Sequence, residues 1–198
     1  MTSAGPEGLP RASRSKADLR ARLRAGRAVR VPDPSAEEAR TVRALTACAG
    51  AGVVAAYAAV PGEPATAELI EQLHLAGVRV LLPVLRREPG WAWYTGPARL
   101  APGPLGIPAP TGPPLGPEAL GAADWVWLPG LAGTPDGRRL GTGGGWYDRA
   151  LAWAAPDAPR GLLLFDDEVL DDLPTDEWDR PVDVLVTERR RLDVRAEQ

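Results

Sequence analysis

The chain has 198 residues, of which 44% are hydrophobic and 25% are charged. This composition is that of an ordinary globular protein, and the length allows one domain to bury a sizeable core. The net charge of −3 excludes a nucleic-acid-binding protein that depends on overall positive charge. Any site for a polyanion must therefore be a local cluster of cationic side chains.

The N-terminal segment, the cysteine content and the apolar runs indicate how the protein is organised and where it is located. Residues 1–14 are rich in Gly, Pro, Ser and Arg without apolar periodicity, which predicts a disordered tail. We expect a single domain over residues 15–198. Cys48 is the only cysteine, so no intramolecular disulfide can form. With no long apolar run and no apolar signal core, we expect a cytoplasmic protein without a membrane partner.

Two helices are expected near the N-terminus. Ser15 can cap a helix over residues 16–24, in which Lys16 and Arg20 stand one turn apart on a basic face. A second helix is expected to begin at Ser35 and to end near residue 49.

Strands and helices then alternate. The apolar run 53–59 predicts a buried strand, a helix is expected over 66–76, and a strand follows over 78–83. Further core strands are expected at 124–128, 161–165 and 182–187. We therefore predict an α/β fold with a single-domain open, mostly parallel sheet and helices on both faces, a Rossmann-like three-layer arrangement. Ligands of such sheets bind at the carboxyl ends of the strands.

Two segments between these elements have a distinctive composition. Residues 95–121 are so dense in Gly and Pro that we expect no regular structure, and we interpret them as an ordered loop over a site. Residues 166–173 are mostly acidic and are expected to form a short exposed helix.

The most informative motif covers residues 138–149, Arg-Arg-Leu-Gly-Thr-Gly-Gly-Gly-Trp-Tyr-Asp-Arg. Its glycines leave backbone amides free to face a phosphate, and a helix opening at Trp146 would present its positive N-terminal end. Arg139 and Arg149 add permanent charge at the two sides. The motif therefore indicates an anion site, and a flexible turn between a strand and a helix is the alternative.

Two well-known phosphate-binding loops are excluded. The P-loop requires a lysine after its glycines, but Lys16 is the only lysine of the chain. The dinucleotide-binding fingerprint requires a third glycine at the position that Trp146 occupies.

The motif and its lead-in resemble a known signature. Pro129-Gly130-Leu131-Ala132 followed by residues 137–149 is similar to the signature of the 5-formyltetrahydrofolate cyclo-ligases, also called 5,10-methenyltetrahydrofolate synthetases. Weaker similarities extend over about residues 15–190. They include the segment from Lys16 to Arg20, the trio Tyr57, Glu63 and Thr66, and the segment from Leu173 to Asp179.

The resemblance implies an ATP- and Mg²⁺-dependent ligase that cyclises 5-formyltetrahydrofolate to 5,10-methenyltetrahydrofolate and releases ADP and phosphate. ATP would phosphorylate the formyl oxygen, and folate N10 would then attack the activated carbon and expel phosphate. ATP and a reduced folate are thus the expected partners of a monomeric enzyme, with Mg²⁺ as its cofactor.

The resemblance also implies the site residues. Arg139 and Asp148 would be catalytic, and Asp148 and Asp179 would hold Mg²⁺, which prefers oxygen ligands. Tyr57 and Glu63 would bind the folate, with Trp146 or Tyr147 stacked on a ring. ATP would contact Lys16, Arg20, Arg139, Leu140, Gly141, Thr142, Gly143, Gly144, Gly145, Trp146 and Tyr147. From the residues alone, Asp148 could equally serve the helix dipole and Asp179 could be a solvated acid.

Some positions depart from the family pattern, namely Ala109, Gly133, Thr142 and Trp146. Thr142 removes a phosphate-binding charge unless Arg138 or Arg149 replaces it. These departures leave open a non-catalytic or regulatory nucleotide- or phosphate-binding protein on the same scaffold. A sugar-phosphate isomerase would need a general base near the sugar, and no such group of residues is visible.

Overall fold

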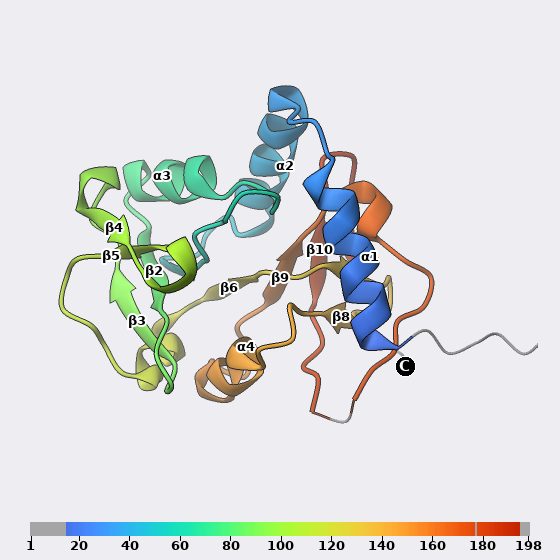
Figure 1. Ribbon diagram of the computed structural model, residues 1–198. Helices are drawn as coiled ribbons and strands as arrows, with labels where there is room; N and C mark the ends of the chain where they lie inside the picture. The colour runs from blue at the N-terminus through green and yellow to red at the C-terminus, as the bar shows by residue number, and fades with distance from the viewer. Residues whose placement is uncertain (1–14, 177, 195–198) are drawn as a thin grey trace, which may run out of the picture.

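The computed structural model describes residues 15–176 and 178–194, so the tail expected over residues 1–14 lies outside the described residues. Its main sheet contains β1 Val53–Ala55, β2 Arg79–Val84, β3 Gly90–Trp93, β6 Trp125–Leu128, β9 Arg160–Leu163, β10 Val184–Val186 and β11 Arg191–Asp193. These strands follow one another in the order β11-β10-β9-β6-β1-β2-β3 (Figure 1). The strands from β10 to β2 pair in parallel, and β11 and β3 are antiparallel edges.

Helices cover both faces of this sheet, as the sequence predicts. The helices α2 (Pro34–Ala47) and α3 (Ala67–Leu75) lie on one face, and the short α4 (Trp146–Ala150) lies on the other (Figure 1). Along β2, Val80 and Leu82 pack in the first layer and Leu81 in the second, because successive strand side chains point to opposite faces. The α/β fold with an open, mostly parallel sheet is thus confirmed.

Side chains cap the two N-terminal helices. Helix α1 (Lys16–Ala28) begins at Ser15, whose hydroxyl accepts a hydrogen bond from the backbone N–H of Asp18. Helix α2 begins one residue earlier than expected, because the Asp33 carboxylate caps it and Pro34 suits its first position.

Within residues 15–176 and 178–194, no helix has the length and apolar character needed to span a membrane.

Helix α1 packs on a small β-ribbon that the sequence did not reveal. The ribbon pairs β7 (Ala132–Gly133) with β8 (Arg139–Leu140). Leu19 of α1 is buried against Leu140 and Leu173, which makes a core separate from the two sheet faces. Figure 1 shows α1 alongside β8 at the edge of the molecule.

The expectation that residues 95–121 lack regular structure is wrong. They contain an antiparallel ribbon of β4 (Leu100–Pro102) and β5 (Pro108–Pro110) with the 3₁₀ turns η1 (Pro97–Arg99), η2 (Pro104–Gly106) and η3 (Pro117–Ala122). The prolines are tolerated because a two-stranded ribbon leaves one side of each strand without a partner, so the missing N–H costs no ladder bond.

The exposed helix expected over residues 166–173 is also absent. Only the 3₁₀ turn η5 (Asp166–Glu168) forms there. Another 3₁₀ turn, η4 (Leu151–Trp153), directly follows α4. Glu168 points inward and is buried, and Leu173 is buried as well. The segment 166–173 therefore belongs partly to the core. Because Glu168 is buried, the segment does not form a solvated helix.

Glu168 is held by a buried ion pair with α1. Arg27 Nε lies 2.6 Å from Glu168 Oε1, and Arg27 Nη2 lies 2.7 Å from both Glu168 Oε2 and the carbonyl oxygen of Gly130. The N–H of Phe165 also donates to Glu168. Both side chains are almost fully buried, so each charge depends on the other for compensation.

We predict that Glu168→Ala lowers the free energy of unfolding by about 3–5 kcal/mol, because it leaves the Arg27 guanidinium buried without its partner. Urea denaturation followed by circular dichroism measures this loss. The control is Asp167→Ala, which removes the partner of Arg30 in an exposed pair and should cost about 1 kcal/mol or less. Equal effects of the two substitutions would contradict the assigned role of Glu168.

Candidate active site

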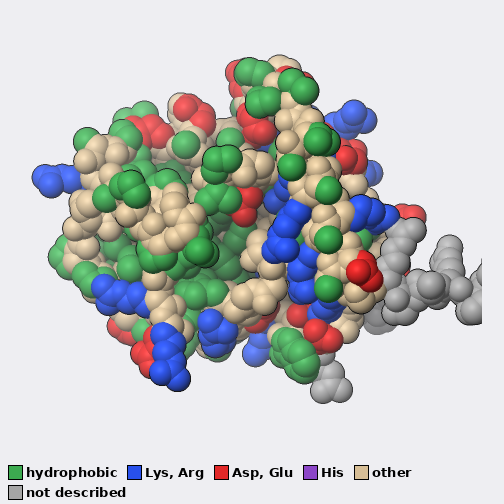
Figure 2. Space-filling model, in the orientation of Figure 1, with side chains coloured by type: hydrophobic (Ala, Val, Ile, Leu, Met, Phe, Trp, Pro, Cys, Tyr) green, Lys and Arg blue, Asp and Glu red, His purple; other side chains and the backbone are tan. Residues whose placement is uncertain are grey.

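A cavity of about 1160 Å³ opens beside the sheet. Tyr57, Pro83 and Pro129 line it, and they stand at or just beyond the carboxyl ends of β1, β2 and β6. Figure 2 shows the hollow between α1 and the β4–β5 ribbon, with Lys and Arg on the flank of α1 and apolar side chains on the ribbon side. The position agrees with the rule that open α/β sheets bind ligands at the carboxyl ends of their strands.

The cavity brings together nearly all of the site residues that the sequence predicts. Its lining includes Lys16, Arg20, Tyr57, Glu63, Arg139, Gly141, Thr142, Gly143, Gly144, Gly145, Trp146, Tyr147, Asp148 and Asp179. Leu140 is the exception, because its side chain is buried against Leu19 and Leu131 instead. The Leu140 side chain thus packs in the core at the start of the glycine loop, and the expected contact of this residue with ATP stays a prediction.

The glycine loop, residues 141–145, is fastened to α1 by its carbonyl groups. Arg20 Nε donates to the carbonyl of Gly141 over 2.9 Å, and Arg24 Nη2 donates to that of Thr142 over 2.7 Å. Among the described residues, no hydrogen bond is donated by the amides of the loop. The loop thus has its carbonyls bound and its amides available at the N-terminus of α4, which is the arrangement of a phosphate cradle.

Arg139 and Asp148 form an ion pair in the cavity. Arg139 Nη2 lies 2.5 Å from Asp148 Oδ1, and the Arg139 side chain is 5% exposed. The Nε atom of Arg139 is buried without a hydrogen-bond partner among the described residues. Asp148 therefore does more than complement the dipole of α4, and Arg139 keeps a donor that no described group satisfies.

Lys16 and Asp179 form the second charged group of the cavity. Lys16 Nζ lies 2.5 Å from both Asp176 Oδ2 and Asp179 Oδ2, and the N–H of Asp176 also donates to Asp179. Burial alone would raise the pKa of Asp179. The hydrogen bonds from Lys16 and from the Asp176 N–H, together with the positive charges of Lys16 and Arg139, outweigh burial and hold that pKa below its usual value. Asp179 is thus an ionised, bonded carboxylate and not a solvated acid.

Tyr57 and Glu63 lie where the chain leaves β1 and turns into α3. The Tyr57 side chain is buried, and its hydroxyl has no partner among the described residues. Glu63 accepts a hydrogen bond from the N–H of Val60, while burial raises the pKa of its carboxyl. The Thr66 hydroxyl donates to the carbonyl of Tyr57 and accepts from the N–H of Ala59, which fixes the loop.

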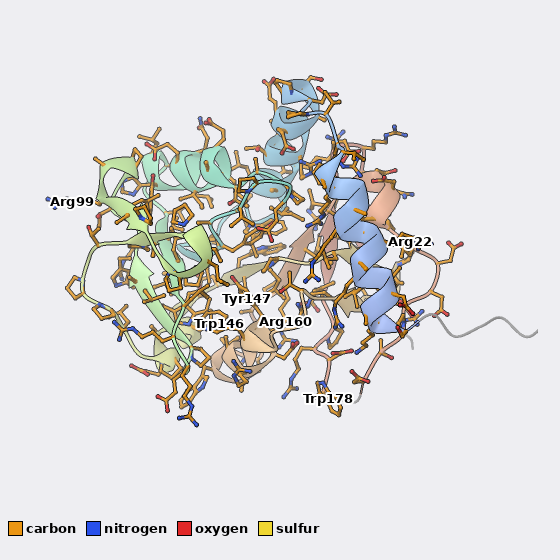
Figure 3. All side chains as sticks on the ribbon, viewed as in Figure 1. Arg22, Arg99, Trp146, Tyr147, Arg160 and Trp178 are labelled. Atoms are coloured by element: carbon orange, nitrogen blue, oxygen red, sulfur yellow. The ribbon has the colours of Figure 1, made fainter. Side chains whose placement is uncertain are left out.

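Trp146 and Tyr147 form the aromatic floor of the cavity (Figure 3). Their ring centroids are 4.8 Å apart at an interplanar angle of 69°, and Trp146 also packs edge-on against Trp91. Burial and the nearby carboxylate of Glu63 raise the pKa of Tyr147, which keeps its hydroxyl protonated. The floor therefore offers apolar ring surface beside one hydroxyl donor.

The structure accounts for the departures from the family pattern. A Cβ at Gly133 would lie 2.5 Å from Leu185 Cδ2, so a side chain there would require the buried leucines around the ribbon to shift. Ala109 pairs with Ala101 in the β4–β5 ribbon and lies outside the cavity lining. Arg138 bonds to Asp136 and Asp172 instead of facing the cavity. Arg149 does line the cavity, so it is the arginine placed to replace the charge missing at Thr142.

Several lining residues were not predicted as site residues, namely Arg86, Pro104, Leu105, Ile107, Trp178 and Arg180. Leu105 and Ile107 belong to the segment 95–121, which borders the cavity as a ribbon with turns; its role over a site stays a prediction. No residue pattern singled out Trp178 or the two arginines, because isolated exposed side chains carry no periodicity.

Three comparisons with known proteins point to one family. A family model described as the 5-formyltetrahydrofolate cyclo-ligase family matches residues 12–188. The chain is 36% identical over 189 residues to a 5-formyltetrahydrofolate cyclo-ligase of Mycolicibacterium smegmatis, which covers 90% of this chain and 96% of the relative. An Escherichia coli K12 protein of the same name is 34% identical over 142 residues, or 69% and 78% of the two chains.

A solved structure gives the same result for the fold. The NMR structure of Aquifex aeolicus 5,10-methenyltetrahydrofolate synthetase superposes with a TM-score of 0.77 and 29% sequence identity. The alignment covers 92% of this chain and 94% of that one.

We predict that Gly143→Ala destabilises the glycine loop while Gly144→Ala does not. Gly143 has φ +102°, and a Cβ there would lie 3.4 Å from Arg20 Nε, so alanine should cost about 1–3 kcal/mol of unfolding free energy. Gly144 has no positive φ and open space around its Cβ position, which makes it the matched control. Urea denaturation of the two variants measures the difference, and equal stabilities would show that the loop does not have this backbone.

Proposed function

The chain belongs to the 5-formyltetrahydrofolate cyclo-ligase family, and on this basis we propose that it converts 5-formyltetrahydrofolate and ATP to 5,10-methenyltetrahydrofolate, ADP and phosphate with the help of Mg²⁺. The cavity size supports two substrates, because about 1160 Å³ exceeds the roughly 300–1,000 Å³ common for one ligand. Its lining also divides into a charged side and an aromatic side.

The charged side supports a triphosphate site. The free amides of residues 141–145 and the cations Lys16, Arg20 and Arg139 converge on it. Fixed amide donors and permanent charges stabilise phosphate oxygens without reorganising, which is the main requirement of phosphoryl transfer.

The carboxylates Asp148 and Asp179 fit Mg²⁺ on the same side. Among the described residues, no group of three or more His, Cys, Asp or Glu side chains could hold a metal alone. This suits an ion that takes one or two carboxylates together with substrate phosphates. Bound there, Mg²⁺ would neutralise charge that develops on the transferring phosphoryl group.

The aromatic side supports the folate. Tyr57, Glu63, Trp146 and Tyr147 combine ring surface with a carboxylate and two hydroxyls. Glu63 would accept hydrogen bonds from pterin N–H groups, and the rings would pack on the pterin. The Tyr57 hydroxyl, buried without a partner among the described residues, would gain one from the substrate.

The reaction requires positioning more than covalent help from the protein. The formyl oxygen attacks the γ-phosphorus of ATP, and the bond to the β,γ-bridging oxygen breaks as ADP leaves. Folate N10 then attacks the formyl carbon, its proton is lost to solvent, and the carbon–oxygen bond breaks as phosphate departs. Both steps depend on holding the reacting groups in line and in contact.

The observation that carries the proposal is the ion pair of Arg139 with Asp148 between the two sides of the cavity. Arg139 lines the same cavity as Asp179 of the charged side and Tyr147 of the aromatic side. A cation within reach of both sides is placed where the phosphoryl group must pass from ATP to the folate.

We predict that Arg139→Ala and Asp148→Ala each lower turnover by at least about a hundredfold, because each removes a charge beside the transferred phosphoryl group. The near-ultraviolet absorbance of the methenyl product, followed with Mg-ATP and 5-formyltetrahydrofolate, measures the rate. Circular dichroism shows whether each variant is folded.

The neighbouring Arg138 provides the control, because it is bonded to Asp136 and Asp172 outside the cavity. Arg138→Ala should keep the wild-type rate. Near-wild-type turnover of either Arg139→Ala or Asp148→Ala would refute their assignment. Absence of product in the wild type with Mg-ATP binding intact would favour a non-catalytic nucleotide-binding protein.

A further inference from the structure

Trp178 lies on the rim of the cavity and takes no part in the proposed chemistry. Its side chain is 70% exposed and belongs to the cavity lining. A single exposed tryptophan needs no explanation in itself. However, the next residue in sequence is Asp179, whose carboxylate is bonded to Lys16 Nζ at 2.5 Å. The indole is therefore attached to the charged side of the cavity.

The aromatic rings of the cavity differ in their accessibility. Tyr57 is 3% exposed, and Trp146 and Tyr147 are half-buried and packed edge-on against each other. In Figure 3, Trp146 and Tyr147 lie in the middle of the molecule, while Trp178 lies at its lower margin. Trp178 thus offers an open ring face at the mouth, at a distance from the aromatic floor.

The proposed reaction fixes the direction in which ATP must lie, so any role of Trp178 toward ATP rests on the proposed function. The γ-phosphate has to meet the folate, which Tyr57 and Glu63 of the aromatic side would hold. The opposite end of the nucleotide, its base, must then point away from the folate. On the charged side, Lys16 is bonded to Asp179, and the adjacent Trp178 lines the cavity at a distance from Tyr147 (Figure 3).

We propose that Trp178 stacks on the nucleobase of ATP. The indole face and the base are both flat and apolar, and stacking removes from water a ring that is otherwise exposed. Arg180, exposed on the same rim, adds a positive charge near the nucleotide. Because every base has a π-face, Trp178 would supply affinity for nucleotides with little choice among bases.

Calorimetric titration of Mg-ATP and of magnesium tripolyphosphate into wild type and variants tests this proposal. Tripolyphosphate carries the phosphate chain without the base. Trp178→Ala should weaken Mg-ATP binding by about ten- to a hundredfold and leave tripolyphosphate binding within about twofold. Trp178→Phe should restore most of the affinity for Mg-ATP.

Trp153→Ala is the matched control, because Trp153 is 50% exposed on η4 and lies outside the cavity lining. It should leave both affinities unchanged. The proposal is overturned if Trp178→Ala weakens both ligands equally, since the indole would then only shape the phosphate side. It is also overturned if Mg-ATP affinity is unchanged, whether or not the KM for 5-formyltetrahydrofolate rises.

These outcomes separate the role of Trp178 from the proposed function. A wild-type protein that binds no Mg-ATP would overturn the proposed function and the role of Trp178 with it. A wild-type protein that binds Mg-ATP and forms the methenyl product, but whose Trp178→Ala variant binds Mg-ATP equally well, would overturn the role of Trp178 alone.

Discussion

One face of α1 holds the site in place through cationic side chains that recur about once per helical turn. From the N-terminus onward they bond to Asp176 and Asp179, to the carbonyls of Gly141 and Thr142, and to Glu168; the cations are Lys16, Arg20, Arg24 and Arg27. Every partner lies in the C-terminal half of the chain. The site therefore depends on a contact between segments more than a hundred residues apart, and α1 positions the glycine loop before any phosphate binds.

The same pairing determines the electrostatics of the cavity. Charges removed from water need partners, and here Lys16, Arg20 and Arg139 already have a carboxylate or a carbonyl beside them. Lys16 keeps the pKa of Asp179 low, although burial opposes this, so the carboxylate stays ionised. Phosphate oxygens would bind next to the cations, and a divalent ion would bind next to the carboxylates. These positive and negative side chains already lie next to one another in the cavity. Such a site is preorganised, and little reorganisation is needed when the substrates bind.

The sequence predicts the sheet well, because apolar runs such as the one at β2 report burial directly. The site residues came from the resemblance, since glycines, one arginine and two aspartates do not by themselves distinguish ATP from other anions. The inward position of Glu168 could not be predicted, because its partner Arg27 lies 141 residues away and its neighbours are acidic. Trp178 was missed for a related reason: its position at the cavity becomes apparent only when distant segments are brought together.

The proposed reaction transfers the terminal phosphoryl group of ATP to the formyl oxygen of the folate in this cavity. Oxygen-18 in the formyl group of 5-formyltetrahydrofolate reports this transfer, by mass spectrometry of the products of a reaction with unlabelled Mg-ATP and water. We expect the label to appear in the released phosphate, since the carbon–oxygen bond breaks after phosphorylation. Unlabelled phosphate accompanying the methenyl product would show that the oxygen leaves by another route and would contradict this mechanism.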